Sequence, residues 1–309
     1  MDKFVVSYAP FARSDNDTNK MFLYISCVLI LPAIYGIMFF GLQALFVILL
    51  SIVACMVSEM FYNFMTKGLM SVNGASSLVT GLILGLTMPV KMPLGVVGLS
   101  AFVAVFITKM AFGGLGKNKL NPALVGRLFA GYFSSFMATN MYNLVHKGEL
   151  LVSLSQGGTN TISNLLSGNS VGGIGTTSIL LILLGLAFLI YSDVLDWKIP
   201  AIAILSYVFA GVMVSDFELT VLNLCSGSFV FVASFMMTDP NTSPNSLLGK
   251  VVYSVAFGAL SAIIWNLGYL GEDTVFVVAL VVNLFVPVLD KYLIFNHKPL
   301  GGYRNAHKN

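Results

Sequence analysis

A series of long apolar runs, almost free of charge, constrains the fold of this chain more than any other feature. A helix needs about 20 predominantly apolar residues to cross a bilayer, and the runs are continuous rather than alternating, which favours helices over barrel strands. Of the 309 residues, 57% are hydrophobic and 9% are charged, and the mean hydropathy is +0.88. A soluble core cannot bury so much apolar surface. The sequence therefore predicts an all-α integral membrane protein.

The apolar runs predict about ten transmembrane helices in a single membrane domain that occupies residues 1–309. Glycine and proline mark most of the expected helix ends. Three of the runs are short for a full crossing, so each is either a half-helix or longer than its apolar pattern shows. The expected helices are 21–40, 42–62, 74–89, 94–112, 122–139, 178–191, 199–214, 219–237, 249–268 and 274–294, of which 74–89, 178–191 and 199–214 are short.

The positions of the basic residues predict the orientation of the chain. With the N-terminus in the cytoplasm, 14 of the 16 lysines and arginines lie at or near the inner side, and only Lys91 and Lys147 lie outside. This asymmetry is what the positive-inside rule requires. We therefore expect both termini inside. The expected order is an inner segment 1–20, five helices in 21–139, an outer connector 140–177, five helices in 178–294 and an inner tail 295–309.

Charge, cysteine spacing and the missing motifs exclude several classes of function. The net charge of +3 is small and scattered over short connectors, which argues against nucleic-acid binding. Cys27, Cys55 and Cys225 lie far apart within apolar runs, so buried packing is expected rather than a metal or cluster site. The chain has no GxxxxGK[ST] or HExxH motif. We therefore assign no catalytic residue and no metal ligand. We also expect the first helix to remain as a membrane anchor, because no signal-peptide cleavage site follows it.

Two helix exits have similar sequences. FGGLGKNKLNPALVGRLF at 112–129 and MMTDPNTSPNSLLGKVVY at 236–253 each combine an apolar helix end, a polar turn with Gly, Asn or Pro and a lysine, and a second apolar helix. Both turns fall on the predicted inner side. This similarity indicates an internal repeat, as in many transport proteins.

Ionisable residues at membrane depth are costly, so each is a hypothesis for a functional site. Glu59, Lys109, Arg127 and Asp239 lie at or near the inner ends of apolar runs. For Lys109 the alternative is a side chain that extends toward the inner headgroups. For Glu59 and Asp239 the alternative is a structural cap.

Arg127 lies in the first turns of the helix that begins at Asn121-Pro122, where the positive helix end also attracts anions. Together with Gly113, Gly114 and Lys117, it would suit a phosphate or an electron-rich ring that approaches the backbone. The competing interpretation is a structural ion pair between Arg127 and Asp239. The predicted cofactor-binding set is therefore Gly113, Gly114, Lys117, Asn121, Arg127 and Asp239.

Four blocks resemble the RnfD family, which is similar to the NqrB subunit of the Na⁺-translocating NADH:quinone reductase. The blocks are SYAPFARSDNDTNKMFLYISCVLILPAIYGIMFFG, FGGLGKNKLNPALVGRLF, SGNSVGGIGTTSILLILLG and FVASFMMTDPNTSPNSLLGKVVYSVAFG. The resemblance covers nearly the whole chain. It implies a membrane subunit of the Rnf complex in the bacterial cytoplasmic membrane, not an enzyme on its own. That complex passes electrons between reduced ferredoxin and NAD⁺ while moving Na⁺ or H⁺. The implied partners are Rnf subunits A, B, C, E and G, especially the flavin-bearing RnfG.

The resemblance also implies flavin cofactors. RnfD-like subunits hold FMN through a phosphoester to a threonine of an outer SGAT-like motif and can hold riboflavin among the helices. The outer connector 140–177 is polar and longer than a usual linker, which favours a site or docking surface there. It has no SGAT motif, and the nearest element is Gln156-Gly157-Gly158-Thr159. Covalent FMN on Thr159, non-covalent flavin and loss of this flavin stay open.

Two alternatives to an Rnf subunit remain at this point. One is a stand-alone transporter or channel for a small solute, built from repeated broken helices. The other is an NqrB-like subunit.

Overall fold

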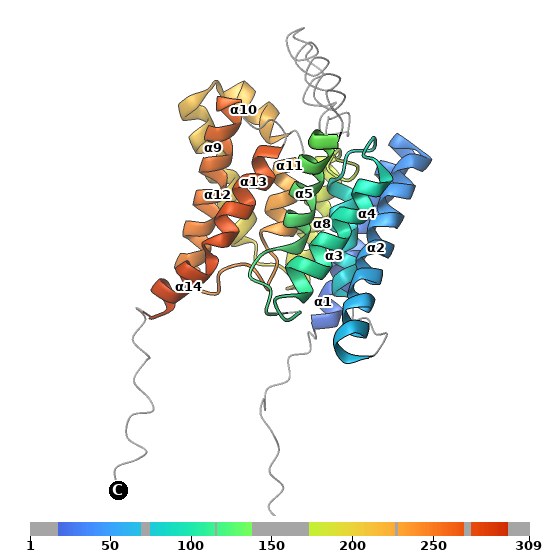
Figure 1. Ribbon diagram of the computed structural model, residues 1–309. Coiled ribbons are helices and arrows are strands. Elements are labelled where there is room, and N and C mark those ends of the chain that lie inside the picture. Colours follow the sequence, from blue (N-terminus) through green and yellow to red (C-terminus); the bar gives the residue numbers. More distant parts are fainter. Residues whose placement is uncertain are drawn as a thin grey trace, which may run out of the picture.

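The computed structural model describes residues 18–68, 75–114, 116–137, 173–225, 228–268 and 273–295, and these ranges contain helices and no strands (Figure 1). The helices in the first half are α1 (Thr18–Phe40), α2 (Leu42–Lys67), α3 (Ser76–Thr87), α4 (Leu94–Phe102) with the π-helix η1 (Val103–Met110), and α5 (Pro122–Met137). Those in the second half are α8 (Ile179–Tyr191), α9 (Lys198–Val214), α10 (Phe217–Leu224), α11 (Ser228–Phe231) with the π-helix η2 (Val232–Met236), α12 (Leu247–Leu267), α13 (Thr274–Leu284) and α14 (Val286–Phe295).

The lengths and compositions of these helices confirm a multi-pass membrane protein. Four segments are long and apolar enough to cross a bilayer: Lys20–Phe40, Leu42–Thr66, Leu247–Leu267 and Thr274–Tyr292. Four shorter apolar helices accompany them. Large apolar side chains cover the outside, for example Leu205 and Phe209 on α9, each 69% exposed. Such a surface fits lipid rather than water. The number of ten crossings stays a prediction.

The half-helix interpretation of the run 74–89 fits the structure. α3 has 12 residues, nearly all buried, so it is about 18 Å long and shorter than the roughly 30 Å hydrocarbon layer. It lies so close to α2 that a Cβ added at Gly81 would be 2.7 Å from the Ile52 Cα atom. The segment after residue 172 covers its C-terminal end, where Gly175 N–H donates to Leu86 O (2.7 Å) and Ile174 N–H to Met88 O (3.0 Å).

Some predicted helix boundaries are wrong. The run 219–237 is not one helix, because α10 ends at Leu224 and α11 begins at Ser228, on either side of a Cys-Ser-Gly sequence that favours a break. The run 274–294, by contrast, agrees with the apolar segment Thr274–Tyr292, although the helix is interrupted at Phe285, just before Pro287, between α13 and α14.

The prediction that all three cysteines are buried is also wrong. Cys55 is buried, Cys225 is partly buried and Cys27 is exposed. Cys27 lies four residues after Leu23 and three before Ile30, both of which are exposed. It therefore belongs to the outward stripe of α1.

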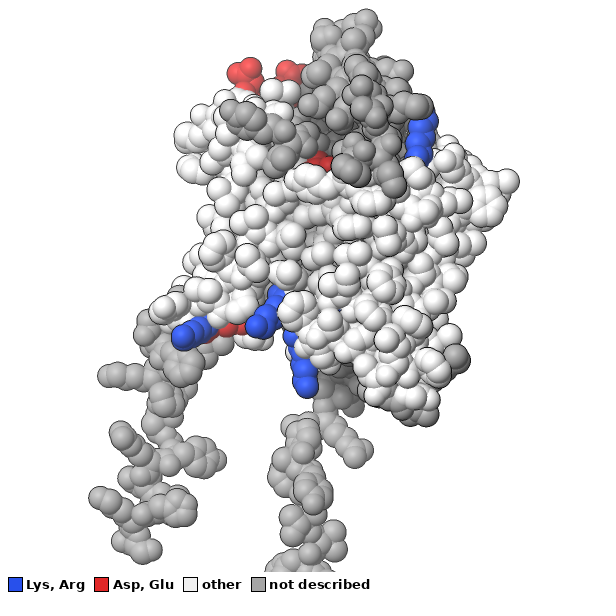
Figure 2. Space-filling model, in the orientation of Figure 1, with Lys and Arg blue, Asp and Glu red and all other residues white. Residues whose placement is uncertain are grey.

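Charged side chains are distributed unevenly between the two ends of the bundle, and which end faces the cytoplasm stays a prediction. α1 begins and α14 ends at the same end of the bundle (Figure 1). The visible lysines and arginines gather mainly at that end, whereas acidic side chains also lie at the opposite end, near α10 (Figure 2). The outer connector 140–177 lies mostly outside the described residues, so its predicted placement is not tested.

Candidate functional site

The two helix exits with similar sequences also have similar structures. Each begins with a π-helix, marked by the bonds Ala111 N–H to Phe106 O (3.1 Å) and Met237 N–H to Val232 O (2.9 Å). A polar turn follows, and then a helix whose N-terminus a side chain caps. The Asn121 Oδ1 atom accepts from Ala123 N–H (3.0 Å) at α5, and the Ser246 Oγ atom accepts from Gly249 N–H (3.0 Å) at α12. π-Helical turns are frequent at functional sites, so these two exits are candidates for such a site.

Asn283, on α13, joins the two polar turns. Its Oδ1 atom accepts from Asn121 N–H (3.0 Å), and its Nδ2 atom donates to Thr242 O (2.9 Å). Asn121 Nδ2 also donates to Met236 O (2.9 Å), the last residue of η2. Sequence reasoning missed Asn283, although a single buried amide in an otherwise apolar helix is a recognisable signal.

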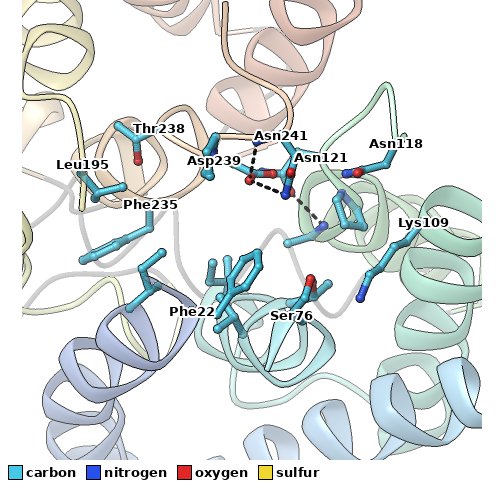
Figure 3. A pocket seen from close by; sticks show the side chains of 17 residues that line it. Phe22, Ser76, Lys109, Asn118, Asn121, Leu195, Phe235, Thr238, Asp239 and Asn241 are labelled. Atoms are coloured by element: carbon cyan, nitrogen blue, oxygen red, sulfur yellow. Dashed lines mark hydrogen bonds between the residues drawn. The ribbon is translucent and has the colours of Figure 1, made fainter. Parts of the chain in front are cut away.

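A cavity lies between the two turns, and its empty volume is about 570 Å³ including the mouth. Figure 3 shows Lys109 and Asn118 on one side, Asn121 near the middle and Asp239 beyond it. The N-termini of α3 and α5 also reach it, through Ser76 and Pro122. The other lining residues are Phe22, Ile25, Val79, Thr80, Ile83, Ala123, Leu195, Phe235, Thr238, Pro240 and Asn241.

Asp239 is partly buried at this cavity and also organises its own turn. Its Oδ1 atom accepts from Asn241 N–H (3.2 Å), and its Oδ2 atom accepts from the Thr242 hydroxyl (3.2 Å). These bonds support the interpretation of Asp239 as a structural cap, and its functional role stays a prediction.

Lys109 belongs to a buried charged cluster at the edge of the cavity. Its Nζ atom lies 3.2 Å from Glu59 Oε2 and donates to Ser77 Oγ at 2.7 Å, and Ser77 in turn donates to the Glu59 carboxylate. Lys109 is 2% exposed and Glu59 is 0% exposed. The interpretation of Lys109 as a side chain that extends to the headgroups is therefore wrong, because a buried carboxylate already holds its charge. Its charge also interacts with that of Asp239.

Arg127 does not pair with Asp239, which corrects the structural alternative from the sequence. Its Nη2 atom lies 2.9 Å from Asp273 Oδ1, its Nε donates to Thr87 O at 2.9 Å, and its guanidinium lies 4.7 Å from the Phe276 ring centre. The carbonyl end of α3 is the negative end of that helix, so it attracts the guanidinium away from the inner turns. Arg127 links α3, α5 and α13 and does not line the cavity.

The other predicted cofactor residues are placed as follows. Asn121 and Asp239 line the cavity, whereas Gly113, Gly114 and Lys117 do not. Gly113 and Gly114 have φ angles of 109° and 86°, which favour glycine, and a Cβ added at Gly113 would be 2.8 Å from Lys117 Cδ. This turn carries Asn118 into the cavity wall and leaves Lys117 exposed. Thr159 lies outside the described residues.

A polar recess with an empty volume of about 1080 Å³ including its mouth adjoins the cavity at the end where α9 and α12 begin. Leu195, Thr238 and Pro240 line both. Within the recess, Asp196 Oδ2 accepts from Lys250 Nζ at 2.7 Å. Burial alone would raise the pKa of Asp196, but the hydrogen bonds and charges of Lys250 and Lys198 outweigh it and lower this pKa below its usual value. The end of the bundle at which α9 and α12 begin thus has a polar approach to the cavity.

These features define a class: a multi-pass helical membrane protein in which two similar broken exits enclose a charged, partly polar cavity. The described residues include no group of three or more His, Cys, Asp or Glu side chains that could hold a metal ion.

The chain belongs to the NQR2, RnfD, RnfE family, whose model matches residues 5–297. This match confirms the resemblance found in the sequence.

Named relatives divide into two groups. The chain is 29% identical to the D subunit of the proton-translocating ferredoxin:NAD(+) oxidoreductase complex of Clostridium ljungdahlii, over 94% of each chain. It is 29% identical to the D subunit of the Na(+)-translocating ferredoxin:NAD(+) oxidoreductase complex of Acetobacterium woodii, over 93% of this chain and 92% of the relative. It is also 29% identical to the B subunit of the Na(+)-translocating NADH-quinone reductase of Pseudomonas aeruginosa, over 70% of this chain and 59% of the relative.

Proposed function

We propose that this protein is the D subunit of an Rnf-type complex in the bacterial cytoplasmic membrane. There it would take part in electron transfer between ferredoxin and NAD⁺, coupled to Na⁺ or H⁺ translocation. The observation that carries the proposal is the match at nearly full length to relatives named as D subunits of such complexes. The relative from the NADH-quinone reductase matches over only 59% of its length, so an NqrB-like subunit is the weaker alternative.

The proposal includes a flavin in the cavity between the two turns. The Asn118 Oδ1 atom is buried and has no hydrogen-bond partner among the described residues, which marks it as an acceptor for a ligand N–H group. Two aromatic side chains, Phe22 and Phe235, offer flat apolar contacts. A flavin ring combines an N–H group and carbonyl oxygens with a flat apolar body, so the residues present suit it.

The space available sets a condition on this proposal. The enclosed part of the cavity is smaller than a flavin ring. A ring of flavin size therefore requires the side chains at the mouth to move apart.

When bound, a flavin would supply the capacity to accept and release electrons. The residues of this chain would hold and orient it: Asn118 and Asn121 at its polar edge, and the capped start of α5 behind them. Asp239 would hold a proton or a cation at its carboxylate near the same place. The polar recess would connect this carboxylate with the inner side.

Covalent FMN on Thr159 is a separate part of the proposal, and the described residues do not test it. Non-covalent binding of this flavin, or its loss, are the alternatives. The other Rnf subunits A, B, C, E and G, and RnfG above all, are the proposed partners. A stand-alone solute transporter would also suit a half-helix such as α3, but the relatives at full length favour a subunit of a complex.

Purification of the chain tests the flavin and its attachment. We expect flavin absorbance in the folded protein, and in-gel fluorescence after denaturation if a covalent bond is present. Thr159→Ala should remove the covalent fluorescence only. Asn118→Ala should remove flavin that is released on denaturation, whereas Lys119→Ala, an exposed change in the same turn, should not. Complete absence of flavin from the purified protein would refute the cofactor proposal.

Co-purification tests the assignment to a complex. A tagged chain expressed in its native host should bring down the other Rnf subunits. Isolation of the chain alone, combined with solute uptake by liposomes that contain only this protein, would favour the stand-alone transporter.

A further inference from the structure

Lys109 is the one lysine among the residues that line the described cavity, and two side chains fix its ammonium group. The ammonium group has three hydrogens, and contacts to Ser77 Oγ and Glu59 Oε2 account for two of them. Since Lys109 is 2% exposed and also lines the cavity, its charge acts on whatever occupies that space with little screening by bulk water.

The backbone fixes this position. Lys109 lies in the last turn of η1, and its carbonyl oxygen accepts from Gly114 N–H at 3.1 Å. Ser77, which receives one of its hydrogens, lies in the first turn of α3. The cluster thus ties the first exit to the start of the half-helix at the edge of the cavity.

We propose that Lys109 is a positioning residue that sets the reduction potential of the flavin in this cavity, with Glu59 as the counter-charge that limits its effect. The inference rests on the proposed function, because it assumes that a flavin binds here. A reduced carrier in a partner subunit would supply two electrons, and bulk solvent would supply one proton through the polar recess. The reduced ring would then add a single negative charge to the site, which a nearby ammonium group would stabilise.

The cluster makes the sign of each substitution predictable. Lys109→Gln removes the positive charge and leaves the Glu59 carboxylate, so it disfavours the reduced ring. Glu59→Gln leaves the ammonium group without its counter-charge, so it favours the reduced ring. The double variant removes both charges together and should lie between the two single variants. A merely structural role for Lys109 would give no such opposite signs.

The size of the effect follows from elementary electrostatics. At an effective dielectric constant of about 20, a unit charge several ångströms away changes a binding or redox equilibrium by about tenfold or more. For a two-electron couple, tenfold corresponds to about 30 mV. We therefore expect Lys109→Gln to lower the midpoint potential by about 30 mV or more, and Glu59→Gln to raise it by a similar amount.

The experiment is a redox titration of the purified full-length chain, loaded with riboflavin and followed by its absorbance. The riboflavin dissociation constant is measured alongside for each protein. Lys119→Gln is the matched control, because Lys119 is an exposed lysine in the turn that follows η1. It should leave the midpoint potential unchanged. The double variant also guards against misfolding, since it leaves neither buried charge unpaired.

The outcomes separate this inference from the function on which it rests. Opposite shifts for the two single variants, with the double variant between them, support the role of Lys109. Two results would overturn that role and leave the flavin site standing. One is a redox equilibrium constant of bound riboflavin that changes less than threefold in the single variants. The other is a midpoint potential that shifts in the same direction in both. A wild-type chain that binds no riboflavin overturns the proposed site itself, and this inference with it.

Discussion

Arg127 allows the most demanding test of the structure, because the sequence offered a different partner for it. The guanidinium donates a charged hydrogen bond to Thr87 O, pairs with Asp273 and lies over the Phe276 ring. A hydrogen bond from a charged group contributes about 1.5–3 kcal/mol. The ion pair contributes about 0.5–1 kcal/mol, since the Asp273 side chain is 26% exposed. The cation–π contact adds about 0.5–1 kcal/mol.

We therefore expect Arg127→Met to lower the free energy of unfolding by about 2.5–5 kcal/mol. At about 2–4 °C per kcal/mol, the melting temperature in detergent should fall by roughly 5–20 °C. Asp273→Asn should cost only about 1 kcal/mol, because it leaves the bond to Thr87 in place. Arg127→Lys should recover only part of the loss, since an ammonium group cannot reproduce the planar fork of the guanidinium.

A double-mutant cycle decides which carboxylate is the partner. Arg127→Met combined with Asp273→Asn should cost less than the two changes added together, because the pair is lost only once. Arg127→Met combined with Asp239→Asn should be additive. Coupling to Asp239 and additivity with Asp273 would refute the reasoning, and would restore the pairing suggested by the sequence.

Three further predictions concern packing, polar bridges and pH. Gly81→Ala should destabilise the protein by about 1–3 kcal/mol, because its Cβ would meet the α2 backbone, whereas Gly95→Ala, with nothing within 4 Å, should not; equal melting temperatures would contradict this. Asn283→Leu should lower the free energy of unfolding by about 2–4 kcal/mol, because it removes the partner of Asn121 N–H and of Thr242 O. A calorimetric scan measures this loss. Because the folded-state pKa of Asp196 is depressed, its bridge to Lys250 should stabilise the protein above about pH 4 and lose this effect as pH falls through the folded pKa. Melting curves of Asp196→Asn against pH check this, and a wild-type advantage that persists at pH 2 would contradict it.

The features that sequence reasoning predicted are those that depend on local patterns. Uninterrupted apolar runs identify helices, because a membrane leaves few other ways to satisfy the backbone. The similarity between 112–129 and 236–253 indicated two related exits, and the structure gives each stretch a polar turn followed by a capped helix, because turn and cap are encoded locally. The π-helices end at or before the start of these stretches. Asn121 and Asp239 were found at the cavity for the same reason.

The features that the sequence could not predict depend on distant partners. Arg127 and Asp273 are 146 positions apart, and only the packing of α5 against α13 brings them together. Lys109 and Glu59 are 50 positions apart. From the sequence, a headgroup contact was an alternative for Lys109, a structural cap was one for Glu59, and Arg127 had Asp239 as its expected partner. The buried partner, and not the residue type, decides between these interpretations.

The two exits share a structure but differ in chemistry, and this difference gives the cavity its character. Lys109 lies one residue before the end of η1, and Asp239 lies three residues after the end of η2. The repeated backbone therefore places a positive group and a negative group at one small space, joined by the amide bridge of Asn283. A symmetric repeat with two like charges would repel itself. Under the proposed function, opposite charges would let an occupant of the cavity gain or lose one charge while Lys109 and Asp239 each keep an oppositely charged group nearby.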